Sequence, residues 1–197
     1  MKRASAIAIG LLITGLAGFQ YSNEAAGQTA AGWTTLFDGK SLAAFNPVGD
    51  ANWQLMEGLV QANKGNGFLV SKTSYGDFQL KVEFWVDDDA NSGVFLRCSN
   101  PKEITATNAY EVNIFDKRPD QAYRTGAIVD VAKPLSNINA GGRWNTFEIT
   151  AQGSHLTVTL NGTRTVDVQH SGHARGPFAL QYGAGTVKFR NVQIRPM

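Results

Sequence analysis

Alternation of apolar and polar residues is the feature of this sequence that most restricts its fold. Between residues 78 and 86 the apolar side chains include Phe78, Leu80, Val82 and Phe84, with polar residues or tryptophan between them. Successive side chains of a strand point to opposite faces, so this pattern is typical of a strand with one buried face. Similar segments recur about every 8–12 residues between glycine-rich turns. The sequence therefore predicts an all-β sandwich or jelly roll.

The first 27 residues differ from the rest of the chain. Lys2 and Arg3 precede an uncharged apolar run at 4–17, and the small residues Ala25-Ala26-Gly27 follow it. This order is typical of a secretory signal peptide cleaved near residue 27. The run is shorter than the roughly 20 residues of a membrane-spanning helix. We expect an exported protein, periplasmic or secreted, whose residues 32–197 form one domain.

Charge and cysteine content narrow the classes of partner. Residues 28–197 hold 16 basic and 15 acidic side chains, because Lys2, Arg3 and Glu24 fall in the predicted leader. This near-neutral region has no polybasic run, which argues against nucleic acid or a membrane surface as its partner. Cys98 is the only cysteine, so no intramolecular disulfide can form and no lipid-bearing cysteine stands near the leader.

A polar surface is expected around residues 91–116, which read as two successive strands. If these strands neighbour the strand at 78–86, one open face carries two carboxylates, a guanidinium, an amide and an aromatic ring: Glu83, Trp85, Arg97, Glu111 and Asn113. Such a set is typical of a sugar-binding surface, with Trp85 as the candidate for stacking on a sugar ring.

Neighbouring residues extend this candidate surface. The polar loop at 117–125 is expected beside the open face, which makes Tyr123 and Arg124 candidates for substrate binding. Gln181 alternates with apolar neighbours and is expected to reach the same face.

Two groups of potential metal ligands carry weaker signals. Asp87-Asp88-Asp89 places three carboxylates in one loop, and calcium prefers clustered oxygen ligands. The spacing is not that of an EF-hand, so a solvated acidic turn is the favoured interpretation. His170 and His173 have no obvious third ligand nearby. We assign no definite cofactor and keep a divalent cation at Asp87–Asp89 as an open alternative.

Several common mechanisms are excluded by missing motifs. The sequence has no G-x-S-x-G elbow, P-loop, dinucleotide fingerprint or H-E-x-x-H motif. Glu111 and Asp116 are five positions apart, so on an unbroken strand they face opposite ways and cannot flank one glycosidic bond. On residue pattern alone, Glu111 could equally be a surface carboxylate, solvated or paired with Arg97.

Two irregularities are expected in the last strands. A two-residue turn at Asn161-Gly162 would place Val166 on the polar face, whereas an odd-numbered loop pairs Val158 with Val166. We predict the odd-numbered loop. The apolar pattern of the final strand changes phase, which predicts a bulge near Arg190–Asn191.

The motifs of the chain resemble those of a known family. They occur in the order typical of the 3-keto-disaccharide hydrolase domain family: T-L-F-D-G-K-S-L, N-S-G-V-F-L-R, Y-E-V-N-I-F-D, T-G-A-I, G-R-W-N-T-F-E-I, L-N-G and F-A-L-Q-Y-G-A-G-T-V-K-F-R-N-V-Q-I-R. The resemblance covers about residues 32–195. It implies a concanavalin A-like jelly roll and an exported bacterial enzyme that cleaves glycosides already oxidised to a ketone at C3 of the sugar.

The resemblance also implies a chemistry. A C3 ketone acidifies the proton on C2, so a base can remove it and the C1 substituent leaves by elimination; later addition of water gives net hydrolysis. This route needs a base, a partner for the enolate oxygen and an acid for the leaving oxygen. By motif position we expect Glu111 as base or acid and Arg97 as the enolate partner. Asp116, Asn91 and Glu83 are secondary candidates.

Departures from the family pattern bear on substrate choice and activity. Ala43-Ala44-Phe45 stands where relatives commonly carry tryptophan, and Lys117 follows Asp116 where a polar amide is common. The main alternative function is a non-catalytic, lectin-like carbohydrate-binding module on the same fold. A third is an interaction domain whose open face binds a protein.

Overall fold

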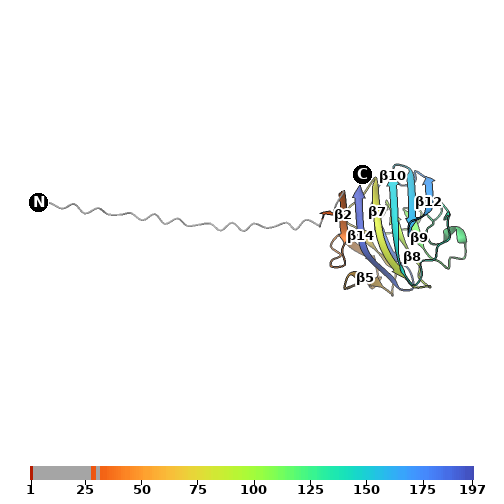
Figure 1. Ribbon diagram of the computed structural model, residues 1–197, viewed down its shortest axis with the longest axis horizontal. Helices are drawn as coiled ribbons and strands as arrows, with labels where there is room; N and C mark the ends of the chain where they lie inside the picture. Colours follow the sequence, from red (N-terminus) through yellow and green to blue (C-terminus); the bar gives the residue numbers. More distant parts are fainter. Residues whose placement is uncertain (2–27, 30–31) are drawn as a thin grey trace.

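Two antiparallel β-sheets packed face to face form the protein in the computed structural model (Figure 1). The structure describes Met1 and residues 28–29 and 32–197, so the predicted signal peptide lies, apart from Met1, outside the described residues. This architecture is a jelly-roll β-sandwich, and the predicted all-β class is confirmed. In the described part of the chain, no helix has the length and hydropathy needed to span a bilayer.

The larger sheet contains nine strands. Its main path runs in the order β1 (Gln28–Thr29), β2 (Trp33–Phe37), β14 (Val187–Pro196), β7 (Phe78–Val86), β10 (Trp144–Gln152), β11 (His155–Leu160) and β12 (Thr163–Gln169). The short strands β4 (Gln54–Met56) and β5 (Leu59–Ala62) join this path because β5 pairs with β14.

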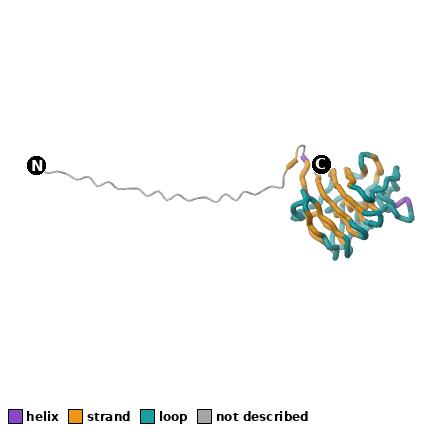
Figure 2. The backbone as a smooth tube through the Cα atoms, turned by 60° about the horizontal axis from the view of Figure 1, so that its bottom comes forward, coloured by secondary structure: helices purple, strands orange, loops and turns teal. Residues whose placement is uncertain are grey.

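The smaller sheet contains five strands, in the order β3 (Phe45–Gly49), β6 (Gly67–Ser71), β13 (Ala179–Tyr182), β8 (Ser92–Leu96) and β9 (Tyr110–Ile114). Loops gather at the ends of the strands in Figure 2, and one of them carries the 3-10 helix η2 (Gln121–Tyr123).

The core between the sheets follows the predicted alternation. In β7, burial alternates from one residue to the next, and Phe78, Leu80, Val82 and Phe84 are fully buried. Phe84 packs on Phe147 of β10 with the ring centroids 4.8 Å apart. Burying one such side chain stabilises the fold by about 1.5–3 kcal/mol. The core therefore fixes which side chains of each strand point outward.

The smaller sheet is also covered on its outer face. Every residue of β6 and β8 is buried. A second apolar cluster lies there, made of Phe68, Val70, Phe95, Cys98, Ile104, Ala109 and Ala179. Ile104 and Ala109 belong to the loop between β8 and β9, so this loop helps to shield the outer face from water.

The strand registers show where β12 and β14 are irregular, and they test the predicted loop at Asn161-Gly162 and the predicted bulge at Arg190–Asn191. Val158 pairs with Val166 as predicted, but the turn has only two residues, and an extra residue, Thr165, bulges out of β12 instead. The predicted odd-numbered loop is therefore wrong: Asn161-Gly162 forms the tight turn that its positive φ angles favour, and a bulge restores the pairing. The predicted bulge at Arg190–Asn191 of β14 is confirmed.

Candidate functional site on the smaller sheet

Three of the predicted site residues lie on the outer face of the smaller sheet, Glu111 and Asn113 on its end strand β9 and Gln181 on its central strand β13. β9 pairs with β8 so that Glu111 lies opposite Phe95 and Asn113 lies opposite Gly93. β8 pairs in turn with β13, where Ala179 lies opposite Phe95 and Leu180 lies opposite Val94, and Gln181 follows Leu180 opposite Phe68 of β6. The alternate residues of these strands belong to the core between the sheets. Glu111, Asn113 and Gln181 therefore share one face of the smaller sheet.

Glu111 is partly buried beside apolar side chains. A Cβ atom placed on Gly93 would lie 3.4 Å from Glu111 Cγ and 3.4 Å from a ring carbon of Phe95, so both side chains lean over this glycine. Burial raises the pKa of Glu111 to about 7, since a carboxylate removed from water is disfavoured; Arg118 lowers the pKa and Asp130 raises it. Near neutral pH this carboxyl group can both accept and donate a proton.

The loop after β9 adds three polar side chains near Glu111. The guanidinium carbon of Arg118 lies 5.8 Å from the ring centroid of Phe115 and 5.9 Å from that of Tyr123. The Tyr123 side chain is hydrogen bonded to Asp130, and this bond raises the pKa of the Tyr123 hydroxyl. Arg118 and Asp130 act electrostatically on Glu111 from this loop.

Backbone hydrogen bonds hold the same loop against the edge of β9. Asn113 N donates to Ala127 O (3.0 Å), and Gly126 N donates to Asn113 O (2.9 Å). Val129 N donates to Glu111 O (3.0 Å). The segment that precedes Asp130 is thus fixed to the strand that carries Glu111.

Two buried amide oxygens on this face accept no hydrogen bond. Asn113 is 2% exposed, and its Nδ2 donates to the backbone carbonyl of Tyr123. A carbonyl only accepts, so this bond fixes the orientation of the amide. Neither Asn113 Oδ1 nor Gln181 Oε1 has a partner among the described residues. Leaving such an acceptor unpaired costs about 1–3 kcal/mol.

Asn91 lies on the same face, at the end of β8. Its backbone N donates to Ala184 O (3.2 Å) and its carbonyl accepts from Ala184 N (3.0 Å). Alternation from Gly93 directs its side chain outward, beside Gly183.

Asp116 lies just past β9 and joins two loops. Its Oδ1 accepts from Thr125 Oγ1 (2.6 Å), and its Oδ2 accepts from Ala140 N (2.7 Å) and Gly141 N (2.9 Å). Both carboxylate oxygens are therefore engaged within the protein. This arrangement gives Asp116 a structural part in positioning the loops around the site.

Arg97 does not share the face with Glu111, and that prediction is wrong. β8 ends at Leu96 and Arg97 has a φ of 52°, so the alternation stops before it. Its guanidinium is 1% exposed and donates to Gly76 O (2.8 Å), Gly153 O (2.7 Å) and His173 O (3.1 Å), and it pairs with Asp77 (3.0 Å). Arg97 thus closes one end of the sandwich.

Glu83 and Trp85 lie on the larger sheet, so their expected place beside Glu111 is also wrong. β7 pairs with β10 and β14, whereas β9 belongs to the other sheet. Glu83 pairs with Arg190 (2.6 Å), and Trp85 lies under the ammonium group of Lys188, 4.3 Å from the ring centroid. Both side chains face away from the smaller sheet.

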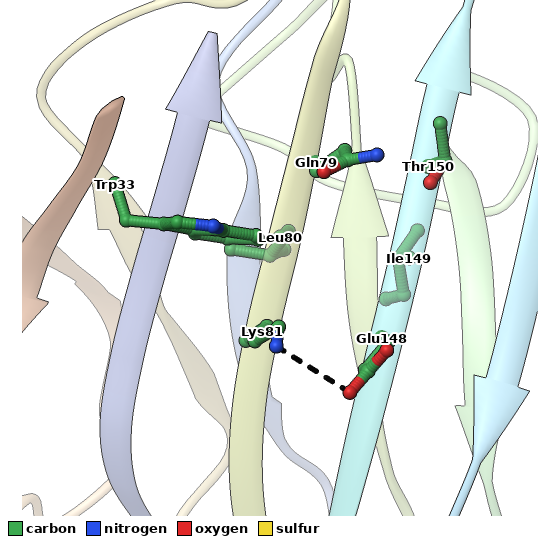
Figure 3. A pocket seen from close by; sticks show the side chains of 7 residues that line it. All are labelled: Trp33, Gln79, Leu80, Lys81, Glu148, Ile149 and Thr150. Atoms are coloured by element: carbon green, nitrogen blue, oxygen red, sulfur yellow. Dashed lines mark ion pairs between the residues drawn. The ribbon is translucent and has the colours of Figure 1, made fainter. Parts of the chain in front are cut away.

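The larger sheet has a small hollow on its outer face (Figure 3). Trp33 borders it, together with the ion pair between Lys81 and Glu148 (3.5 Å). Its volume is about 70 Å³. Pockets for small ligands are typically about 300–1,000 Å³, so this hollow is too small for a sugar ring.

Arg124 is buried and holds loops together. Its guanidinium donates to Gln121 Oε1 (3.2 Å) and to Asn139 Oδ1. The predicted substrate-binding role of Arg124 therefore has little support in its contacts, whereas Tyr123 lies between Arg118 and Asp130 beside Glu111.

Two of the three carboxylates of the acidic loop, Asp87 and Asp89, are engaged within the protein. Asp87 accepts from Asp89 N (3.1 Å) and Thr186 N (2.7 Å), and Asp89 pairs with Lys117 (2.7 Å). Among residues 28–29 and 32–197, no three His, Cys, Asp or Glu side chains are grouped to hold a metal ion.

Sequence reasoning missed Arg118 and Asp130. Both lie in loops, where alternation gives no information about direction. Asp130 has a φ of 59° and follows the segment bound to β9, which only the structure reveals.

Comparison of the sequence with models of known families identifies the same family as the motifs. The sequence model of the 3-keto-alpha-glucoside-1,2-lyase-like domain matches residues 32–195. The chain belongs to this family. No curated protein matches the sequence significantly.

Solved structures similar to this lyase-like domain include carbohydrate-related proteins. Two candidate glycosyl hydrolases from Parabacteroides distasonis align with TM-scores of 0.76 and 0.71, at 20% and 25% identity; each alignment covers 84% of this chain, and 94% and 99% of the respective structures. A carbohydrate-binding module of family 66 from Bacillus subtilis aligns with a TM-score of 0.60 at 19% identity, over 83% of this chain and 95% of the module.

Replacing Arg97 should mainly weaken the fold of the lyase-like domain. Arg97→Met leaves Asp77 and three backbone carbonyls without their buried partner, so we expect the free energy of unfolding to fall by about 3–5 kcal/mol. Urea unfolding measures this change. Arg164→Met, which removes an exposed ion pair with Asp167, should cost less than about 1 kcal/mol. Normal stability with lost activity in Arg97→Met would instead place Arg97 in the site.

The raised pKa of Glu111 should appear in the pH dependence of stability. Between the ordinary pKa of 4.5 and the folded value of about 7, the folded state keeps a proton that the unfolded state releases. This group therefore makes the domain less stable as pH rises through that window, by up to about 3 kcal/mol. The free energy of unfolding is measured in urea at pH 4, 5.5 and 8 for the parent protein and for Glu111→Gln. The variant should lack the loss of stability that the ionisation of Glu111 causes between pH 4 and pH 8. Identical pH profiles for both proteins would contradict the shift.

Proposed function

We propose that the domain cleaves 3-keto-glycosides by elimination on the outer face of the smaller sheet, with Glu111 as the proton-transferring group. The observation that carries this proposal is the partly buried carboxyl group of Glu111, whose pKa is about 7. Family membership supplies the substrate class, and the sugar-related structural neighbours agree with it.

Glu111 alone could perform both proton transfers. In its ionised form it takes the proton from C2, the electrons of that C–H bond form a C2=C3 double bond, and the former C3 ketone becomes an enolate with its negative charge on the C3 oxygen. The enolate then expels the oxygen at C1, the C1–O bond breaks, and protonated Glu111 gives its proton to the leaving oxygen. The products are an unsaturated 3-keto sugar and an alcohol. A pKa near the working pH suits both steps.

Arg118 and Tyr123 are the groups that we assign to the developing negative charge. Arg118 takes the role expected of Arg97, because it is the cation that acts on Glu111. The Tyr123 hydroxyl stays protonated because its hydrogen bond to Asp130 raises its pKa. It holds a single proton, so it donates to the enolate oxygen only when the substrate replaces Asp130 as the acceptor. Donors placed where charge develops are a large source of rate enhancement.

A carbohydrate-binding module is the second candidate function. The similarity to the family 66 module over most of both chains favours it. In that case the buried amides would hold a sugar and the raised pKa of Glu111 would have no catalytic use. Export to the periplasm or the medium is part of either proposal and rests on the sequence of residues 1–27 alone.

Product analysis separates the two functions. The purified domain is incubated with 3-keto-trehalose and with trehalose, and the products are identified by mass spectrometry. We expect an unsaturated 3-keto sugar or its hydrate from the oxidised substrate alone. Glu111→Gln should lower turnover by about 10²- to 10⁴-fold, the usual contribution of a general acid–base group, while sugar binding is retained.

Glu83→Gln is the matched control, because it makes the same substitution on the larger sheet. Glu83 pairs with Arg190 there, so this variant should keep full turnover. Equal turnover by Glu111→Gln and the parent protein would exclude Glu111 as the catalytic group. Sugar binding without any product from several 3-keto-glycosides would favour the binding module.

A further inference from the structure

A hollow of about 440 Å³ lies between η2 and the segment 133–137. It is here called the loop pocket, and its lining residues are Gln121, Ala122, Lys133, Pro134, Leu135 and Asn137. Its volume falls within the range of about 300–1,000 Å³ that is typical of small-ligand pockets. The proton transfers proposed for Glu111 use none of these side chains, so the loop pocket is available for another part of a ligand.

The loop pocket adjoins the hydrogen bond between Tyr123 and Asp130, because the same two chain segments form both. Tyr123 directly follows the wall residues 121–122 in η2. Asp130 precedes the opposite wall, which begins at Lys133, by three residues. The bond between the two side chains therefore spans from one wall segment to the other. Since Asp130 also acts electrostatically on Glu111, the loop pocket lies next to the groups that surround this carboxyl group.

Hydrogen bonds fix both walls of the loop pocket. Gln121 Nε2 donates to Arg118 O (2.7 Å), and Gln121 Oε1 accepts from Arg124 Nη1 (3.2 Å). On the opposite wall, Leu135 N donates to Thr165 O of β12 (2.8 Å). The pocket is therefore formed before a ligand binds, which lowers the entropic cost of binding.

The side chains of the loop pocket favour a ligand with an apolar face. Leu135, which lines the pocket, is 65% exposed, and Ala122 and Pro134 add apolar surface. A ligand that covers this surface releases the water in contact with it, which favours binding. Lys133 and Asn137 are exposed and carry N–H donors for an acceptor oxygen at the edge of the ligand.

We propose that the loop pocket binds the leaving group of the glycoside and selects one that carries an apolar ring, such as an aryl alcohol. This inference rests on the proposed function, in which the C1–O bond breaks beside Glu111 and an alcohol departs. The sugar then lies at Glu111, and the group attached through the C1 oxygen extends past Tyr123 and Asp130 into the pocket. A second sugar as leaving group presents more hydroxyl groups to Leu135, so an aryl ring is the better fit.

Leu135→Asn tests this inference, because it removes apolar surface and keeps a side chain of similar size. The side chain is exposed and the backbone bond to Thr165 is retained, so stability in urea should hold. Affinity for phenyl 3-keto-α-glucoside, measured by calorimetry in the Glu111→Gln background to prevent turnover, should fall about 10-fold. Affinity for 3-keto-trehalose should be weaker in the parent background and should change by less than about 2-fold.

Leu55→Asn in the same background is the matched control. Leu55 is 48% exposed on β4 of the larger sheet, so its replacement should leave affinity for the phenyl glycoside unchanged. Unchanged affinity in Leu135→Asn, an equal loss for both ligands, or no binding of the phenyl glycoside would each overturn the inference. A loss confined to Leu135→Asn and the phenyl glycoside, together with no turnover by the parent protein, would support the loop pocket as an aryl site and reject the proposed catalysis.

Discussion

Burial of strands β6, β8, β9 and β13 on both faces of the smaller sheet governs the chemistry of three polar side chains, Glu111, Asn113 and Gln181. Its inner face packs on the larger sheet, and its outer face is shielded by the apolar cluster around Phe68 and Phe95. Glu111, Asn113 and Gln181 stand on that shielded outer face. Removal from water raises the pKa of the carboxyl group and makes unpaired amide oxygens costly. The same burial that stabilises the sandwich therefore gives one carboxyl group a pKa of about 7 and leaves two amide oxygens without a hydrogen-bond partner among the described residues.

Much of the fold could be predicted because a strand has a period of two. The alternation in residues 78–86 identified β7 and its buried side chains, and the phase change near Arg190–Asn191 located a bulge. The order of strands in each sheet could not be predicted, since alternation carries no information about neighbours. The turn at Asn161-Gly162 shows a second limit: a bulge at Thr165 produces the same pairing as a longer loop, and the sequence does not distinguish them.

The candidate site was predicted only in part, for the same reason. Glu111, Asn113 and Gln181 were placed on an outward face by alternation, and three neighbouring strands bring them together. Glu83 was wrongly grouped with them because the order of the strands cannot be read from the sequence, and β7 belongs to the larger sheet. Arg97 was misplaced because a positive φ angle turns its side chain into the end of the sandwich. Loop residues carry no periodic signal, and the charges that act on Glu111 come from loops.

The pKa of Glu111 decides whether the outer face of the smaller sheet holds a carboxyl group that can exchange a proton near neutral pH. Carboxyl ¹³C resonances of the glutamates can be followed by NMR from pH 3 to pH 9, with Glu111→Gln used to assign the signal. We expect one carboxyl group, assigned to Glu111, to titrate near pH 7, because it is partly buried on the outer face of the smaller sheet. Titration of Glu111 at its ordinary value, about 4.5, would show that water reaches the group freely and would contradict the burial of its carboxyl group.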